Sequence, residues 1–161
     1  MDIRRSYLPG FERTNRDILD SIDLLRRTDL GRPGKSSVGG WHSHDLSTAV
    51  LPGFDALSAF LRKEVGGFDE LWAIVNGKGH FNRQHKHNPG RVSAAYYIQV
   101  PRPAAAIVFP GVRGRRIEPE PGLLLTFDGS LTHSVEVNES DGLRVSISCN
   151  FLVSSRSFFR T

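Results

Sequence analysis

The spacing of apolar residues along the chain changes near residue 70. Before that point, two segments show the three- and four-residue spacing of amphipathic helices. One begins at the capping residue Thr14 and continues to Thr28, and the other covers residues 54–65 and is ended by Gly66 and Gly67. A loop rich in glycine and serine lies between them, at residues 31–40. We expect both helices to pack on the outside of a sheet.

From Leu71 onward the apolar residues fall in short runs, rich in β-branched and aromatic side chains. Glycine, proline, asparagine and aspartate separate the runs, as they do where turns join strands. Strands at this spacing favour a sandwich or barrel over a parallel α/β sheet. The predicted strands cover residues 71–75, 92–100, 105–109, 123–127, 134–137 and 143–152.

The length of 161 residues suits one domain with its own hydrophobic core. We predict a single domain over residues 1–161. Within it, residues 1–70 form a helical N-terminal layer with a loop that leads into the fold, and residues 71–153 form the β core.

The composition of the chain indicates where we expect the protein to be located and which partners we expect it to have. No apolar run approaches membrane-spanning length, and the first residues lack the apolar run of a signal peptide. The single cysteine, Cys149, excludes an intramolecular disulfide, which fits a reducing compartment, so we expect a cytoplasmic protein. The net charge is +4, but the basic residues are scattered along the chain. The one cluster, at residues 113–116, is predicted to be a turn between strands. This distribution argues against a nucleic-acid partner.

The last predicted strand has two different faces. The apolar set is Val145, Ile147, Cys149 and Phe151, and the polar set is Arg144, Ser146, Ser148 and Asn150. A wholly polar inward face is costly unless it contacts a ligand or water. Arg144 and Ser146 together could hold a carboxylate by charge-assisted hydrogen bonds. Taken alone, this segment is more simply interpreted as an ordinary half-exposed strand whose polar side faces solvent.

Three histidines favour the other interpretation, in which the polar face of this strand contacts a bound ligand. His85 and His87 are two residues apart, so in an extended strand they project to the same side. His133 follows 46 residues after His87, and Arg144 follows His133 after 11 more. A third imidazole from a distant strand could close a three-ligand face around one metal ion, with the arginine holding an anion bound to that metal. The pattern indicates a non-haem iron site with an acidic cosubstrate.

The other polar candidates have weaker patterns. His42 and His44 have spacing suited to a metal, but they lie in the glycine-rich region, so a pocket-lining or surface role is expected. His80, Asn82 and Gln84 have the opposite parity to His85, which places them on an exposed edge.

Tyr96 and Tyr97 lie on opposite faces of their strand. Tyr97 shares its face with Ser93 and Gln99, the more polar one. It is therefore the candidate to donate a hydroxyl hydrogen bond into the site.

An ordered set of segments resembles the small bacterial and phage 2-oxoglutarate/Fe(II)-dependent oxygenases. The segments are HKHNPG at 85–90, SAAYYI at 93–98, EPGLLLTF at 120–127, HSV at 133–135 and RVSISCNF at 144–151, with GGWHS upstream at 39–43. The resemblance spans roughly residues 39–152. Each motif is weak alone, whereas the ordered set is specific.

The resemblance implies a double-stranded β-helix, a cupin-like jelly roll with the metal inside one open end. His85, His87 and His133 would bind Fe(II), and Arg144 with Ser146 would bind the far carboxylate of 2-oxoglutarate, with Tyr97 beside them. O2 and an unidentified substrate would complete the reaction, which in this family is usually a hydroxylation that converts 2-oxoglutarate to succinate.

One position departs from the family's common pattern, in which the second ligand is an aspartate or glutamate. Here it is His87, which raises the charge of the site by one. Three outcomes are open: a three-histidine site runs the same chemistry, His87 does not coordinate the metal, or the protein is a catalytically altered relative.

Two other classes of function also stay open. A cupin-type three-histidine dioxygenase or isomerase would explain His87 but would leave Arg144 and Ser146 without a role. In a non-enzymatic β-sandwich binding module, the histidines would be structural. The sequence indicates neither the substrate nor the oligomeric state.

Overall fold

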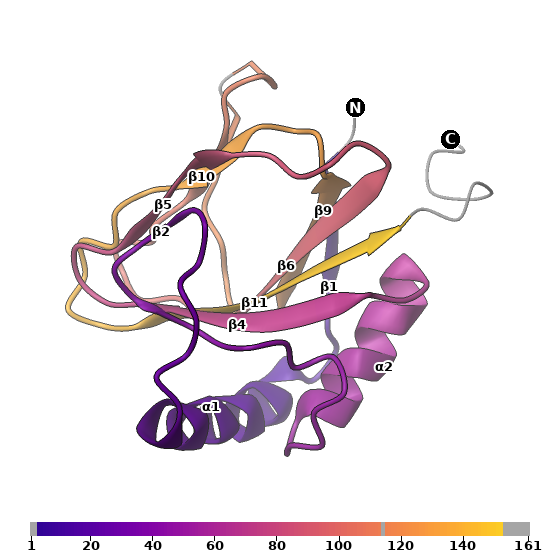
Figure 1. Ribbon diagram of the computed structural model, residues 1–161, viewed down its shortest axis with the longest axis vertical. Helices are drawn as coiled ribbons and strands as arrows, with labels where there is room; N and C mark the ends of the chain where they lie inside the picture. The colour runs from indigo at the N-terminus through magenta and orange to yellow at the C-terminus, as the bar shows by residue number, and fades with distance from the viewer. Residues whose placement is uncertain (1–2, 114, 153–161) are drawn as a thin grey trace.

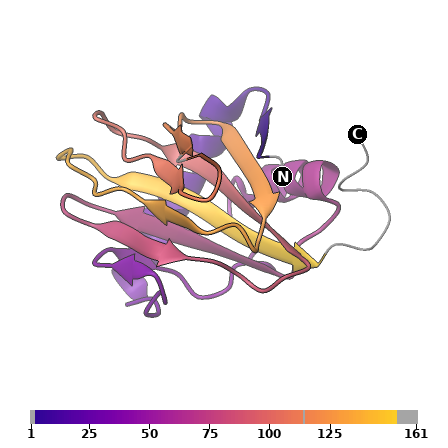
Figure 2. The same cartoon turned by 90° about the horizontal axis from the view of Figure 1, so that it is seen from above.

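The computed structural model describes residues 3–113 and 115–152. Two antiparallel sheets face one another, and two helices lie against one of them (Figure 1). Seen from above, the long strands of the larger sheet run side by side, with the yellow C-terminal strand between its neighbours (Figure 2). This arrangement is the predicted jelly roll, and the predicted fold class, mainly β with N-terminal helices, is confirmed.

The larger sheet has six strands. Their order is β1 (Arg4–Tyr7), β9 (Leu123–Asp128), β6 (Arg91–Gln99), β11 (Arg144–Leu152), β4 (Glu70–Asn76) and β3 (Trp41–His42). The nine-residue β11 therefore lies in the middle, paired with β6 on one side and β4 on the other. The smaller sheet has the order β2 (Ser37–Val38), β5 (Phe81–His85), β10 (His133–Val135), β7 (Ile107–Phe109) and β8 (Arg115–Ile117).

The helices α1 (Phe11–Thr28) and α2 (Phe54–Val65) cover the outer face of the larger sheet, as expected. Their apolar stripes share one hydrophobic core with the apolar face of β11. The members of this core on the helices and β11 are Ile18, Ile22, Phe54, Leu57, Phe60, Leu61, Val65, Val145, Ile147, Cys149 and Phe151. Among the described residues, no helix is long and apolar enough to cross a membrane.

A second core lies between the two sheets and closes one end of the jelly roll. It is rich in aromatic and branched side chains: Tyr97, Ile107, Phe109, Ile117, Leu123, Leu125, Phe127 and Leu131. The polar face of β11 extends beyond this core. Polar side chains therefore line the other end of the space between the sheets.

The structure corrects several predicted boundaries. Helix α1 begins at Phe11 rather than after Thr14, because Gly10 takes a left-handed backbone (φ 63°) just before it. The N-terminal layer is not wholly helical, since β1, β2 and β3 also lie in it. These strands have two to four residues, too few to show a clear alternation.

The predicted turn at residues 113–116 is partly wrong, because Arg115 and Arg116 belong to strand β8, and residue 114 lies outside the described residues. Residue 153, the predicted end of the β core, and the ends of the predicted 1–161 domain lie outside the described residues.

Leu57 tests the packing of α2 on the sheet, because its side chain is fully buried in the shared core. Leu57→Ala should lower the free energy of unfolding by about 2–5 kcal/mol, through lost apolar burial and the cavity left behind. Leu30→Ala is the matched control, since Leu30 is 100% exposed, and should change stability by less than about 0.5 kcal/mol. Urea denaturation with an unchanged m-value measures both; equal effects would contradict the packing.

Candidate metal centre and cosubstrate pocket

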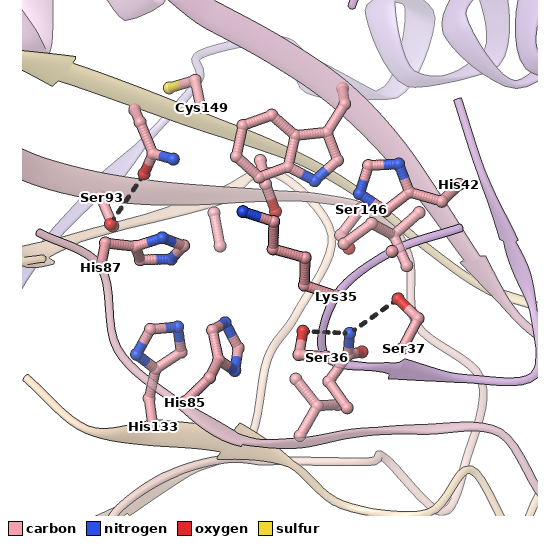
Figure 3. A pocket seen from close by; sticks show the side chains of 18 of the residues that line it. Lys35, Ser36, Ser37, His42, His85, His87, Ser93, His133, Ser146 and Cys149 are labelled. Carbon is pink, nitrogen blue, oxygen red and sulfur yellow. Dashed lines mark hydrogen bonds between the residues drawn. The ribbon is translucent and has the colours of Figure 1, made fainter. Parts of the chain in front are cut away.

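A cavity of about 640 Å³ opens between the polar face of the larger sheet and the smaller sheet. All six predicted site residues line it: Tyr97, His85, His87, His133, Arg144 and Ser146. They come from four strands and one loop, and Figure 3 shows the three histidine rings gathered on one side. The structure thus brings together every side chain that the sequence marked for the site.

The three histidines form one cluster of possible metal ligands, with ligand atoms within 4.8 Å of one another. His133 in β10 is the cross-strand partner of His85 in β5, and their ring centroids are 4.3 Å apart. The His87 ring lies 5.2 Å from that of His85 and 5.4 Å from that of His133. Three imidazoles at this spacing can converge on a single ion.

His87 reaches the cluster by a route that strand alternation did not predict. Strand β5 ends at His85, so His87 lies in the following loop. Its backbone N–H donates to the carbonyl of Gly129 at 2.7 Å, which ties the loop to the turn after β9. A side chain at Gly129 would place its Cβ 2.9 Å from the Arg91 carbonyl, so this close approach requires glycine.

Hydrogen bonds fix which ring nitrogen of two histidines faces the cluster. Nδ1 of His85 donates to the carbonyl of Arg83 at 2.8 Å, and Nδ1 of His133 donates to the carbonyl of Leu131 at 2.8 Å. A carbonyl only accepts, so Nδ1 carries the proton and the lone pair resides on Nε2. A ring whose far nitrogen donates to a backbone carbonyl is typical of metal-binding imidazoles.

Two of the three histidines, His87 and His133, are held in their neutral form. Burial lowers the pKa of His87 to about 4, with repulsion from His85 and Arg91 adding to the effect. Burial also lowers the pKa of His133 to about 4, and the hydrogen bond to Leu131 offsets this only in part. Neutral imidazole is the form that binds a metal ion.

Arg144 is almost completely buried, with 3% of its surface exposed. Its Nε donates to the carbonyl of Ala105 and one terminal nitrogen donates to Ser146 Oγ, both at 3.3 Å. Within residues 3–113 and 115–152, no carboxylate forms an ion pair with it. Burial lowers the pKa of the guanidinium, because a charge without a counter-ion is disfavoured away from water.

Tyr97 lies beside this arginine. The guanidinium carbon of Arg144 is 5.2 Å from the centre of its ring. The Tyr97 side chain is fully buried. The Arg144 guanidinium interacts with its hydroxyl oxygen, but the hydroxyl hydrogen has no acceptor among the described residues. Burial raises the pKa of Tyr97, so the hydroxyl keeps its proton as a donor. An orphaned donor and an unpaired cation on one wall fit an anionic ligand.

The structure also shows lining residues that the sequence did not single out. Asn82, predicted at an exposed edge, is buried and lines the cavity. The reason is a β-bulge, because β5 advances three residues where β10 advances two, which resets the alternation between Asn82 and His85. His42 lines the cavity as expected and stacks on Trp72, with ring centroids 5.8 Å apart.

Comparison with known families adds an independent finding. Residues 70–117 match the model of a family described as "Putative 2OG-Fe(II) oxygenase". The resemblance to 2-oxoglutarate/Fe(II) oxygenases is confirmed. The matched segment includes His85, His87 and Tyr97, whereas His133 and Arg144 lie beyond it. The comparison with curated proteins found no match.

Solved structures share the oxygenase fold over nearly the whole chain. A prolyl hydroxylase from Trichoplax adhaerens, in complex with a hypoxia-inducible-factor peptide fragment, has a TM-score of 0.76 at 14% identity, covering 93% of this chain and 83% of its own. A Pseudomonas putida prolyl-4-hydroxylase has a TM-score of 0.72 at 16% identity, covering 93% and 91%.

A third similar structure contains a cosubstrate. The viral collagen prolyl hydroxylase of Paramecium bursaria Chlorella virus-1, solved as a 2-oxoglutarate complex, has a TM-score of 0.68 at 13% identity, covering 94% and 96%. At such identities these likenesses establish the fold. The shared fold and the family match over residues 70–117 agree with the predicted class of enzyme, an oxygenase that uses Fe(II) and 2-oxoglutarate.

The low pKa values of His87 and His133 predict how the stability of the metal-free protein depends on pH. In the unfolded chain these histidines take up protons near pH 6.5, whereas in the folded protein they do so near pH 4. Stability should therefore be fully present above pH 6.5 and fall as the pH is lowered toward 4.

His87→Gln removes one of these groups and should flatten that slope by up to about 1.4 kcal/mol per pH unit. Urea midpoints measured between pH 4.5 and 7, with a chelator present, test it. Gln84→Ala, a substitution of an exposed, non-titrating residue outside the cavity, should leave the slope unchanged. A slope that is the same in His87→Gln and the wild type would refute the assignment.

Proposed function

We propose that the protein hydroxylates its substrate with Fe(II) held by His85, His87 and His133 and with 2-oxoglutarate anchored by Arg144. The observation that carries the proposal is the buried guanidinium of Arg144, in the same cavity as the histidine cluster and without a carboxylate partner among the described residues. A buried charge is stable only when it is paired and hydrogen-bonded. An anionic ligand in the cavity would supply that pairing.

The far carboxylate of 2-oxoglutarate fits this role. A guanidinium presents planar, paired N–H donors that match the two oxygens of a carboxylate. Ser146 accepts from Arg144 and so has its own hydroxyl hydrogen free to donate, and Tyr97 offers a second hydroxyl. One cation and two hydroxyl donors would thus surround the carboxylate, and all three lie on adjacent strands of one rigid sheet.

The histidine cluster suits Fe(II). Imidazole is a good ligand for iron, and the Nε2 lone pairs of His85 and His133 are set toward the cluster by their Nδ1 hydrogen bonds. Three neutral histidines leave the full +2 charge of the metal uncompensated by the protein. A doubly negative cosubstrate would offset part of this charge, with one carboxylate at the metal and the other at Arg144. The histidine at position 87 therefore strengthens the demand for an anionic ligand.

The chain's own residues position the reactants and exclude water. When bound, Fe(II) and 2-oxoglutarate would supply the chemistry of this class: 2-oxoglutarate loses CO2 and takes one oxygen atom of O2 to become succinate, and the other oxygen atom enters a C–H bond of the substrate as a hydroxyl group. Arg144, Ser146 and Tyr97 orient the cosubstrate. The second core closes the space behind it, with Phe127 and Phe109 packed beside His133 at ring-centroid distances of 4.8 and 6.0 Å.

Hydroxylation is the outcome we favour, because three of the similar structures are prolyl hydroxylases. O2 and a substrate that is not yet identified are the other reactants. A cytoplasmic location and the lack of a nucleic-acid partner stay predictions from the sequence, supported by the single cysteine and the scattered basic residues.

Arg144→Gln tests the anchor. It should weaken 2-oxoglutarate binding by about thirtyfold or more, because a fully buried charge pair is lost, while Fe(II) affinity changes little. Anaerobic titration of the Fe(II) protein with 2-oxoglutarate, followed by the metal-to-ligand absorption band, measures this. The matched control is Arg83→Gln, which alters an exposed arginine on β5 and should bind normally. Equal loss of iron and 2-oxoglutarate would count against the assigned role.

His87→Ala tests the third ligand. If His87 coordinates the metal, this change and His133→Ala should each lower Fe(II) affinity by about a hundredfold or more. Each removes one metal–nitrogen bond, and loss of a partner that only supports a ligand already costs about tenfold to a hundredfold. Competition with a chromogenic chelator gives the affinities. Wild-type affinity in His87→Ala, beside a large loss in His133→Ala, would reduce the protein's ligand set to two histidines.

A further inference from the structure

The polar face of β11 extends well beyond the proposed 2-oxoglutarate site. Arg144 and Asn150 are six residues apart on this strand, which corresponds to about 20 Å of extended chain. A five-carbon diacid held at Arg144 is much shorter than that. The far part of the face, from Ser148 to Asn150, therefore remains available for the substrate, and both residues line the same cavity.

Asn150 is a fixed hydrogen-bond donor in this far part. It is the cross-strand partner of Ser93 in β6, and the Ser93 hydroxyl donates to its side-chain oxygen at 2.9 Å (Figure 3). That bond leaves the amide N–H groups of Asn150 without a partner among the described residues. Asn150 is only 7% exposed, yet it lines the cavity, so those hydrogens are available to a bound molecule rather than to bulk water.

A lysine reaches the cavity from the opposite side. Lys35 lies on the loop before β2, and Figure 3 shows its side chain extending into the cavity. It forms no ion pair or hydrogen bond with any residue of the described part of the chain. Exposed lysines without a partner are common on protein surfaces, but the side chain of Lys35 extends into the cavity, where it can contact a bound molecule.

The loop that carries Lys35 is firmly anchored. Asn82 donates from its amide to the hydroxyls of both Ser36 and Ser37 at 3.2 Å, and the backbone N–H of Arg83 donates to the carbonyl of Ser36 at 2.7 Å. At the other end, the Arg32 N–H donates to the carbonyl of His42 at 2.8 Å. These hydrogen bonds fix the backbone of the loop and therefore hold Lys35 at one side of the cavity.

The charges around the cavity are strongly unequal. The lining residues include five bases and one acid: Arg32, Lys35, Lys86, Arg91, Arg144 and Glu70. Arg144 is assigned to the cosubstrate, and Arg91 pairs with Asp69 at 3.5 Å. Even without these two, positive charge exceeds negative charge at the open side of the cavity, where it would attract an anion.

Building on the proposed function, we infer that the substrate is an anionic molecule, held at two points. Lys35 binds its carboxylate or phosphate group, and the amide of Asn150, oriented by Ser93, donates to a carbonyl oxygen nearer the metal. Two fixed contacts of this kind would set which carbon of the substrate lies closest to the iron.

The test uses binding without turnover. The protein is loaded with Ni(II) and 2-oxoglutarate, and the fluorescence of Trp72, which lines the cavity, reports probe binding. The probes are N-acetyl-L-amino acids against their neutral carboxamides, and glycerol 3-phosphate against glycerol. Each anionic probe that binds should bind more tightly than its neutral partner. The pair that shows the difference identifies the anionic group.

The variants locate the contacts. Lys35→Gln should weaken binding of the anionic probe about tenfold and remove most of its salt dependence. Asn150→Leu should weaken binding of the N-acetyl-L-amino acids by a similar factor. Lys63→Gln, which removes the same charge from the exposed side of α2, is the matched control and should bind as the wild type does.

The outcomes separate this inference from the proposed function. If Lys35→Gln binds anionic probes like the wild type, if neutral partners bind equally well, or if no anionic probe binds, the inference is overturned. In all of those cases the absorption band of the Fe(II) protein with 2-oxoglutarate would still form. Lack of that band in the wild type would instead overturn the proposed function.

Discussion

The alternation of side chains along β11 is the constraint on which this molecule is built. Because β11 pairs with β6 and β4 on its two sides, its backbone is fixed and each side chain is committed to one face. Val145, Ile147 and Cys149 face the helices, and Arg144 and Ser146 face the cavity. A slip of one residue would exchange the two sets. It would bury a guanidinium under the helices and expose the core, so the hydrophobic packing of α1 and α2 also holds the register of the polar site.

Much of this could be read from the sequence because long strands and helices carry their own periodicity. The central strands, the helix at 54–65 and the two faces of the last strand were predicted nearly to the residue. The histidines and Arg144 could be identified because few structural roles require those residue types in that order. Their chemistry is therefore visible without knowledge of the fold.

The rest depends on contacts that a linear pattern does not contain. The bulge in β5 turns Asn82 into the cavity, and parity counting cannot locate an inserted residue. His87 lies in a loop fixed to Gly129, so it reaches the cluster from outside the strand on which the alternation argument had placed it. Lys35 and Asn150 could not be identified as site residues from the sequence, because only the fold shows that the loop before β2 and the strand β11 line the same cavity.

The hydrogen bonds behind the proposed metal ligands have a consequence for how the protein would acquire and lose a metal ion. His85 and His133 each donate to a carbonyl two residues earlier in their own chain segment, so each ring is oriented by local backbone rather than by the ion. Loading would then require little rearrangement. A chelator should strip the centre reversibly and leave a folded apoprotein, in contrast to small zinc domains, which collapse when their ion is withdrawn.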